Sequence, residues 1–167
     1  ILAFNYQMGS DWINYQRMYD VDIISYDFND IFFDNPFQKE KGYVLLNLLG
    51  RKLKLNYEIF MGLLLCFCII LILKVGKRYS RNIYIFLYII LSKYILIASL
   101  EPTIRQFLAV TIITLGYRYI EKRKIVNYLF IIILATQFHK SAIIGIIVYF
   151  LDKINITLKK CIFLIAF

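Results

Sequence analysis

The sequence contains few residues that break helices and few charged residues. Its 167 residues include two prolines and seven glycines, and charged residues make up 19% of the chain. Hydrophobic residues make up 60%, and the mean hydropathy is +0.65. This composition excludes a disordered chain and an ordinary soluble domain. We therefore expect a membrane protein.

Cysteine is also scarce. Cys66, Cys68 and Cys161 all lie in apolar runs, and the first two fall on opposite sides of a helix, which indicates packing and neither a disulfide nor a metal site. Asp20 and Asp22 match the Asp-x-Asp pattern of nucleotide-sugar transferases, but that motif needs an α/β nucleotide-binding domain around it, and the segment shows no strand-helix alternation. No glycine-rich phosphate loop, zinc spacing or serine elbow is present, so we expect no metal and no cofactor.

Acidic residues are rare in the second part of the chain. Residues 1–58 carry eight acidic and six basic side chains, whereas residues 59–167 carry three acidic and fourteen basic ones. Most of the latter lie in connections between apolar runs, where basic residues set the orientation of a membrane protein. The pattern therefore favours an orientation signal over nucleic acid binding.

Residues 1–58 are polar and aromatic, and we expect an external loop of short helices there, with an amphipathic helix from Tyr43 to Leu53. Apolar runs follow at 59–75, 83–100, 103–120 and 125–151, and another begins near 160. Basic clusters follow the first and third runs, which predicts that both connections are cytoplasmic. The predicted fold class is all-α: a polytopic transmembrane helical bundle with an external loop of short helices. Because the sequence starts at Ile1 and stops inside an apolar run, we expect both termini to be truncated.

The run 125–151 holds the single histidine of the chain and permits two arrangements. One helix of 27 residues would cross the membrane but would deliver the basic residues after it to the outside, against the charge rule. Two pieces, 125–138 and 141–151, would return the chain to the cytoplasm. We favour this hairpin, with its turn at the outer boundary and His139 facing a cavity open to the outside.

Arg105 and Gln106 lie near the outer end of the third run. Ala109, Ile112 and Gly116 continue a stripe from Arg105 along one helix face, and its small residues would let a helix or lipid tail approach closely. Arg105 is either an arginine that snorkels to the interface or a ligand-binding cation.

His139 is an ionisable group inside an apolar run, and such a group is costly enough that a function is the default hypothesis. Histidine suits proton transfer near neutral pH. The alternative is a turn residue bonded to backbone. Lys140 would reach the membrane boundary or contact phosphate, and Ser141 could cap the helix that follows.

Near the start of the chain, Gly9 and Ser10 permit a tight turn, and Tyr15 falls one helical turn after Asp11. Asp11 is either a helix cap or a functional carboxylate facing the same cavity.

Three blocks carry a family pattern: MGSDWINYQRMYD at 8–20, KEKGYVLLNLLGRKL at 39–53, and the segment 104–151, where Ile-Arg-Gln precedes Phe-His-x-Ser-Ala by about thirty residues. In order and spacing they resemble the EpsG family of Wzy-like bacterial polysaccharide polymerases over nearly the whole chain. The resemblance implies shared positions at Gly9, Asp11, Tyr15, Arg105, Gln106, His139 and Ser141. The family has Glu-Pro-Gly-Phe or a variant where this chain has Glu40-Lys41-Gly42-Tyr43, which leaves the role of Glu40 open.

The resemblance implies a membrane glycosyltransferase that polymerises repeat units carried on undecaprenyl diphosphate at the outer face of the bacterial cytoplasmic membrane. Its partners would be the lipid-linked glycan, the bilayer, and flippase and chain-length regulator proteins. The alternatives are a lipid-linked oligosaccharide flippase and a polysaccharide-modifying membrane acyltransferase.

The expected chemistry displaces a diphosphate from an anomeric carbon by a sugar hydroxyl. Arginine binds diphosphate oxygens in a bidentate manner, so we assign Arg105 to the leaving group, with Lys140 as a helper and Gln106, Tyr15 and Ser141 as further binding residues. His139 or Asp11 would serve as the base. No metal is required, because fixed cations can stabilise the diphosphate.

Overall fold

The computed structural model describes residues 12–34, 37, 39–98 and 104–151, and every regular element in these ranges is helical. The elements are α1 (Trp12–Asp20), the 3-10 helix η2 (Asp22–Ser25), α2 (Phe28–Phe33), α3 (Lys41–Lys52), α4 (Tyr57–Tyr79), α5 (Ile83–Ala98), α6 (Ile104–Leu115), α7 (Tyr117–Glu121), α8 (Ile125–Thr136), the 3-10 helix η3 (Lys140–Ile144) and α9 (Gly145–Leu151). The all-α prediction is therefore confirmed for the described part of the chain.

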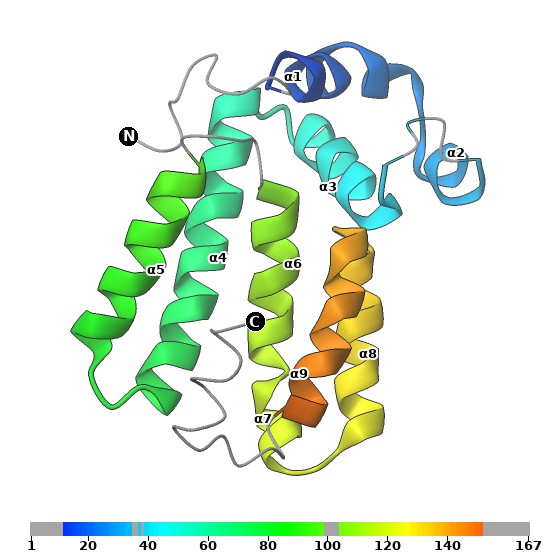
Figure 1. Cartoon of the computed structure of the whole chain (residues 1–167). Coiled ribbons are helices and arrows are strands. Elements are labelled where there is room, and N and C mark those ends of the chain that lie inside the picture. Colours follow the sequence, from blue (N-terminus) through cyan, green and yellow to red (C-terminus); the bar gives the residue numbers. More distant parts are fainter. Residues whose placement is uncertain (1–11, 35–36, 38, 99–103, 152–167) are drawn as a thin grey trace, which may run out of the picture.

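The long helices form a bundle in which α6 packs between α4 and α8, and α5 packs on α4 (Figure 1). At one end of this bundle lie α1, η2, α2 and α3, and at the other end lies α7 (Figure 1). The helices predicted within residues 1–58 thus cover one end of the bundle. This arrangement brings the start of α6 next to α1 and α3.

Helix α4 is the longest element. Its N-cap residue is Asn56, whose side chain accepts a hydrogen bond from the Ile59 N–H at 2.9 Å. Its 23 residues extend for about 35 Å at 1.5 Å per residue. Among the described residues it is the one helix whose length and hydropathy suffice to cross a membrane. The multi-pass arrangement therefore stays a prediction.

The third apolar run, expected as one helix over 103–120, is divided at Gly116 into α6 and α7. The Gly116 N–H donates to the Ile113 carbonyl, and the Tyr119 N–H donates to the Gly116 carbonyl, so both bonds tighten the helix to a 3-10 turn. A Cβ at Gly116 would lie 2.9 Å from Ile131 Cγ2 on α8. Close packing of α8 therefore coincides with the break.

The run 125–151 also contains a break, and the single long helix is not present. Helix α8 ends at Thr136, η3 begins at Lys140, and α9 lies alongside α8 (Figure 1). Gly145 permits the close approach, because a Cβ there would lie 2.8 Å from Ile132 Cδ1, and its carbonyl accepts the Tyr128 hydroxyl at 2.8 Å. The reversal places residues 137–139 at the end of the bundle that α3 covers.

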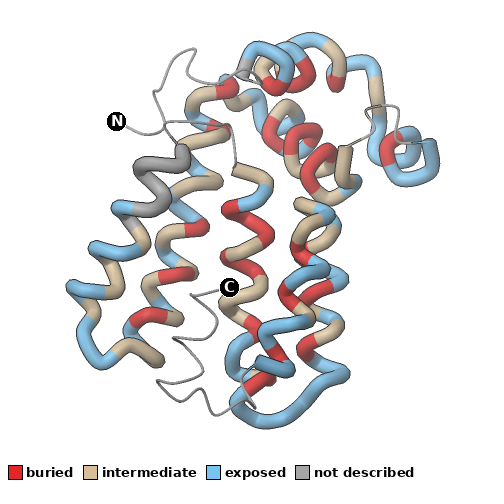
Figure 2. Tube along the Cα trace, in the orientation of Figure 1, coloured by how far each residue is buried: buried red, intermediate tan, exposed pale blue. Residues whose placement is uncertain are grey.

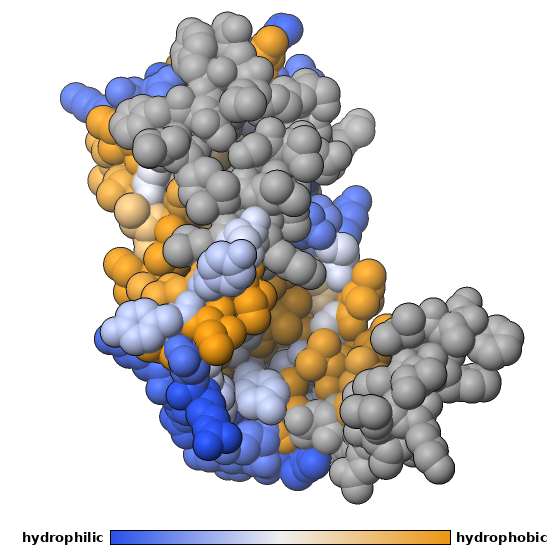
Figure 3. All heavy atoms as spheres, turned by 60° about the vertical axis from the view of Figure 1, so that its left-hand side comes forward, coloured by the Kyte–Doolittle hydropathy of each residue, from blue (hydrophilic) through white to orange (hydrophobic). Residues whose placement is uncertain are grey.

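Apolar side chains also face outward from the bundle. Buried residues lie on the facing sides of the helices (Figure 2), but α4 exposes Ile59, Leu63, Phe67 and Ile70, each by 50–54%. These positions follow helical spacing and form one stripe. On the face shown in Figure 3, an apolar zone lies between two hydrophilic ends. Such a continuous apolar surface indicates contact with lipid or with further helices.

The predicted amphipathic helix is α3, and it packs on the bundle. It buries Tyr43, Val44, Asn47 and Leu48, whereas Leu49 is 46% exposed. Tyr43 joins an aromatic cluster with Tyr57 and Phe60 of α4. This packing fixes the first turn of α3 beside the start of α6.

Candidate functional site

Arg105 is held at the start of α6 by contacts on several sides. Its Nη1 donates to Glu40 Oε2 at 2.5 Å, and its Nη2 donates to the Tyr15 hydroxyl. Its Cζ lies 5.0 Å from the Tyr15 ring centroid and 5.7 Å from that of Tyr43. The side chain is 16% exposed. A planar guanidinium fits this site of one carboxylate and two rings, which an ammonium does not match.

Glu40 connects Arg105 to the turn between α8 and η3. It is the N-cap residue of α3, and its side chain is 8% exposed. While Oε2 accepts from Arg105, Oε1 accepts the backbone N–H of Lys140 at 3.1 Å. One carboxylate therefore joins three segments that are distant in the sequence.

Burial alone would raise the pKa of the Glu40 carboxyl. Hydrogen bonds from its own backbone N–H and from that of Lys140, and then the Arg105 charge, outweigh burial and hold this pKa below its ordinary value. Glu40 is therefore ionised near neutral pH and is a poor general base.

His139 is the N-cap residue of η3, with an extended backbone (φ −157°, ψ 127°). Its Nδ1 lies 2.6 Å from Ser141 Oγ and 3.2 Å from the Ser141 backbone N, and the latter N–H donates to the ring. The predicted cap, Ser141, is thus the residue that is capped. The prediction that Ser141 caps this helix is therefore wrong, because the extended backbone at His139 aims its ring at the Ser141 N–H, which has no partner within the helix.

The two Ser141 contacts favour different tautomers of the imidazole. If Nδ1 accepts the backbone N–H, a neutral ring carries its proton on Nε2 and can only donate there. If Nδ1–H donates to the Ser141 hydroxyl, Nε2 has a free lone pair and can act as a base. The Ser141 side chain therefore influences the proton chemistry of His139.

Helix α3 and the 137–139 turn are in direct backbone contact. The Tyr43 N–H lies 3.2 Å from the Gln137 carbonyl oxygen, to which it donates. A Cβ at Gly42 would lie 2.7 Å from that same oxygen, so only glycine fits here without a shift. This contact brings Glu40 within reach of the Lys140 N–H.

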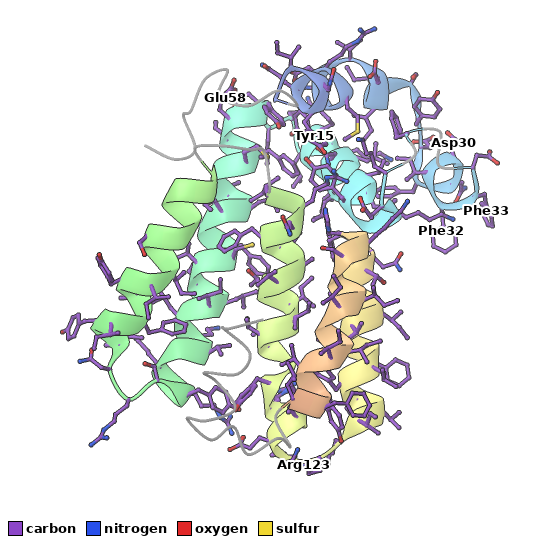
Figure 4. The ribbon with its side chains drawn as sticks, in the orientation of Figure 1. Tyr15, Asp30, Phe32, Phe33, Glu58 and Arg123 are labelled. Carbon is purple, nitrogen blue, oxygen red and sulfur yellow. The ribbon has the colours of Figure 1, made fainter. Side chains whose placement is uncertain are left out.

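Several predicted site residues lie at this end of the bundle, and Figure 4 shows Tyr15 there. Arg105 contacts Tyr15 directly and is linked to the residue after His139 through Glu40. Lys140 contributes its backbone N–H, while its side chain is exposed, and Gln106 is also exposed. Asp11 and Gly9 lie outside the described residues.

Sequence reasoning left the role of Glu40 open and treated Tyr43 only as part of an amphipathic face. The sequence does not single out Lys39, whose Nζ lies 5.3 Å from the Tyr15 ring centroid. The one signal was a carboxylate directly before an apolar helix, within a block of the family resemblance.

The Asp-x-Asp pair is not part of this cluster. Asp20 lies 3.6 Å from Arg51, and Asp22 lies 3.9 Å from Arg17. Both pairs involve partly exposed side chains on the covering helices, where such pairs contribute little to stability.

The side chains of this cluster are of the kinds that bind anions and transfer protons. The Glu40 carboxylate accepts from the Arg105 guanidinium and from the Lys140 backbone N–H, and the residue directly before Lys140 is His139, whose imidazole contacts Ser141. Lys39 and Lys140 add positive charge at its edge.

Comparison with known proteins gives one match. No curated protein and no solved structure is detectably similar to this chain. The sequence profile of the EpsG family matches residues 1–167. Since this match covers the entire sequence, the chain belongs to the EpsG family.

Proposed function

We propose that this protein is a metal-independent membrane glycosyltransferase that polymerises undecaprenyl-diphosphate-linked repeat units at the outer face of the cytoplasmic membrane. Membership of the EpsG family supports a role in polysaccharide biosynthesis. The polymerase reaction is supported chiefly by one observation. The partly buried Arg105 guanidinium is joined through Glu40 to the turn that carries His139.

The membrane location is supported by α4 and by its outward apolar stripe. The orientation is supported by the two ends of the bundle. Arg123 lies at the end with α7, whereas Tyr15, Asp30 and Glu58 lie at the opposite end (Figure 4). Basic connections favour the cytoplasm, so the end with Tyr15 faces outside in this proposal.

The proposed reaction forms one bond and breaks another at the anomeric carbon. The oxygen of an acceptor sugar hydroxyl attacks that carbon, the bond to the diphosphate oxygen breaks, and the diphosphate leaves with the electron pair. Arg105 stabilises the charge that develops on the leaving group. His139 takes the hydroxyl proton at Nε2 in the tautomer whose Nδ1–H donates to the Ser141 hydroxyl, and in this tautomer the bond from the Ser141 backbone N–H to Nδ1 is given up. Asp11 is the alternative base.

Glu40 is not the base in this proposal. Its pKa is held low despite burial, by its hydrogen bonds and by Arg105, so it binds a proton weakly near neutral pH. Its role is to connect Arg105 with the Lys140 peptide.

A flippase would need a polar path open to both leaflets. The contacts described above gather at one end of the bundle, which favours chemistry at one membrane face. An acyltransferase that modifies the polymer is the other rival.

The test is the lipid-linked glycan in cells that lack the protein. Loss of a polymerase should leave single repeat units on lipid, and an impermeant periodate reagent should oxidise them in intact cells from which the outer layers have been removed. Loss of a flippase should leave them protected inside. Loss of an acyltransferase should leave polymer of normal length without acyl groups, and either of these last two results would contradict the proposal.

A further inference from the structure

The Glu40 carboxylate occupies a position that is suited to a phosphoryl group. Its two oxygens take two donors that reach it from different elements: the Arg105 Nη1 at 2.5 Å and the Lys140 backbone N–H at 3.1 Å. A phosphoryl group also presents two oxygens on one atom, and arginine with a backbone N–H is a common set of ligands for it. Glu40 thus resembles an internal anion in a site for an external one.

The charges around Glu40 do not allow both anions to bind side by side at low cost. Arg105 is a partly buried cation of the described cluster, with a side chain that is 16% exposed, and Lys39 and Lys140 lie at the edge of this cluster. With Glu40 in place, the Arg105 charge is already paired. A diphosphate placed against the same guanidinium would meet the carboxylate at short range, and like charges repel strongly in a partly buried site. One anion therefore excludes the other.

Arg105 has an unused donor as well. Its Nε is buried, and no acceptor among the described residues lies within hydrogen-bond distance of it. A buried donor without a partner is costly unless a ligand or water supplies one. A diphosphate, which has more oxygens than a carboxylate, could engage Nε as well as the two donors that Glu40 uses.

The protein can release the Glu40 side chain without losing the elements around it. Although Glu40 is the N-cap residue of α3, its side chain makes no capping hydrogen bond to that helix. Arg105 would keep its contacts with the Tyr15 hydroxyl and with the rings of Tyr15 and Tyr43. Departure of Glu40 therefore frees the Arg105 Nη1 and the Lys140 N–H while Arg105 stays in place, at the cost of the hydrogen bond from the Glu40 backbone N–H.

We propose that the donor diphosphate binds to the Arg105 guanidinium and the Lys140 backbone N–H, and that Glu40 occupies this place in the ligand-free protein and leaves when the donor binds. This inference rests on the proposed function and adds a binding group and a form of regulation to it. Since Lys140 follows His139 directly, the same peptide that binds the leaving group also positions the imidazole.

The first test is calorimetric titration of inorganic pyrophosphate into the full-length protein purified in detergent. Glu40→Gln keeps the size of the side chain but removes its charge. Pyrophosphate should therefore bind this variant at least about fivefold more tightly than it binds the wild type, because the fraction of open sites rises. The matched control is Glu58→Gln, which removes a carboxylate on α4 at the same end of the bundle (Figure 4) and should leave the affinity unchanged. Equal or weaker binding to Glu40→Gln would overturn the inference, since Glu40 would then only position Arg105.

A second measurement needs no variant. Photochemical carbene labelling, read residue by residue with mass spectrometry, reports the exposure of Glu40 in the wild type, where its side chain is 8% exposed. Saturating pyrophosphate should increase labelling of Glu40 and leave that of Glu58 unchanged. Unchanged or reduced labelling of Glu40 would show that the carboxylate stays in place.

The same titrations separate this inference from the proposed function. A parallel titration with farnesyl diphosphate distinguishes a lipid-linked donor from free pyrophosphate. If the donor is lipid-linked, farnesyl diphosphate and pyrophosphate should both bind the wild type, and both should bind Glu40→Gln more tightly. Binding without displacement of Glu40 overturns only the exchange of anions. Absence of binding to the wild type and to Glu40→Gln would count against the diphosphate site and hence against the polymerase itself.

Discussion

Arg105 uses the shape of its side chain as well as its charge. Two of its nitrogens donate to Glu40 and Tyr15, and its plane lies near two aromatic rings. Snorkelling to an interface would require only a long cationic side chain. The geometry therefore favours a ligand-binding role for Arg105 over an interface anchor, and substitution by lysine tests this.

We predict that Arg105→Lys shortens the polysaccharide almost as severely as Arg105→Ala. An ammonium keeps the charge but lacks the planar group that donates to Glu40 and Tyr15 at the same time. The readout is the length ladder of the extracellular polysaccharide beside the membrane abundance of each variant. Arg17→Lys is the matched control, since Arg17 is 73% exposed, and it should give a normal ladder. A normal ladder from Arg105→Lys would return Arg105 to the role of an interface anchor.

His139 should act in one unit with Arg105. We predict that His139→Ala reduces long chains toward single repeats, and that His139→Ala combined with Arg105→Ala is little worse than either single change. Groups that serve one transition state give losses that do not add. The measurement is again the ladder at equal membrane abundance. Losses that multiply would indicate that the two residues act independently.

The sequence predicted part of this residue cluster. Arg105 and His139 stand out because an ionisable group in an apolar run needs a reason. Glu40 does not stand out, since it lies in a polar segment with other acidic residues. Its importance depends on partners 65 and 100 residues away, and only the packing of α3 reveals them.

Among the elements, α3 has the strongest influence on the site, because its first turn touches the 137–139 turn through backbone atoms. Helix propensity and charge do not report such a contact. The break after Thr136 was predictable, because one long helix would have placed basic residues on the outer side. The break at Gly116 was not, since one glycine in an apolar run is compatible with a continuous helix.

Gly42→Ala tests the contact between α3 and the turn. A new Cβ would lie 2.7 Å from the Gln137 oxygen and 2.9 Å from its Cβ, so α3 or the turn must shift. We predict a loss of about 1–3 kcal/mol in stability, together with shorter polysaccharide. The measurements are thermal unfolding in detergent and the ladder. Leu49→Ala, at an exposed position of α3, should change neither, and an equally mild Gly42→Ala would mean that the contact is loose.

Lys54→Gly tests the end of the same helix. Lys54 follows α3 with φ at 57°, in the left-handed region that disfavours a side chain. Glycine should therefore stabilise the protein by about 0.5–1 kcal/mol, read as a higher unfolding midpoint. Lys52→Gly, at the last residue of α3, should have the opposite sign, because glycine lowers helix stability and removes the ion pair with Asp27. A lower midpoint for Lys54→Gly would contradict this account.

For the whole molecule, the two ends of the bundle should lie on opposite sides of the membrane. Figure 4 shows Asp30 near one end and Arg123 at the other. The charge distribution predicts this orientation, which stays a prediction. It does not give the number of spans, because several apolar helices are shorter than a bilayer requires.

We predict that reporters fused after Arg81 and Arg123 are cytoplasmic and that one inserted near Asp30 is external, as the basic connections require. In intact cells, a cysteine in place of Lys140 should react with an impermeant thiol reagent, and one in place of Lys122 should not. Both positions are exposed on the protein surface, so access depends on the side of the membrane. An external reporter after Arg123 would reverse the orientation and place the Arg105 site on the cytoplasmic face.

The bond between the Glu40 carboxylate and the Lys140 peptide also has a consequence for biosynthesis. Its two ends are 100 residues apart, so Glu40 is made long before its partner leaves the ribosome. Arg105, the other partner of Glu40, is 65 residues after it in the chain and is synthesised before Lys140. The site is therefore completed only after the turn with His139 has been synthesised, and a nascent chain stalled before this turn has Glu40 and Arg105 but no joined site for donor and base.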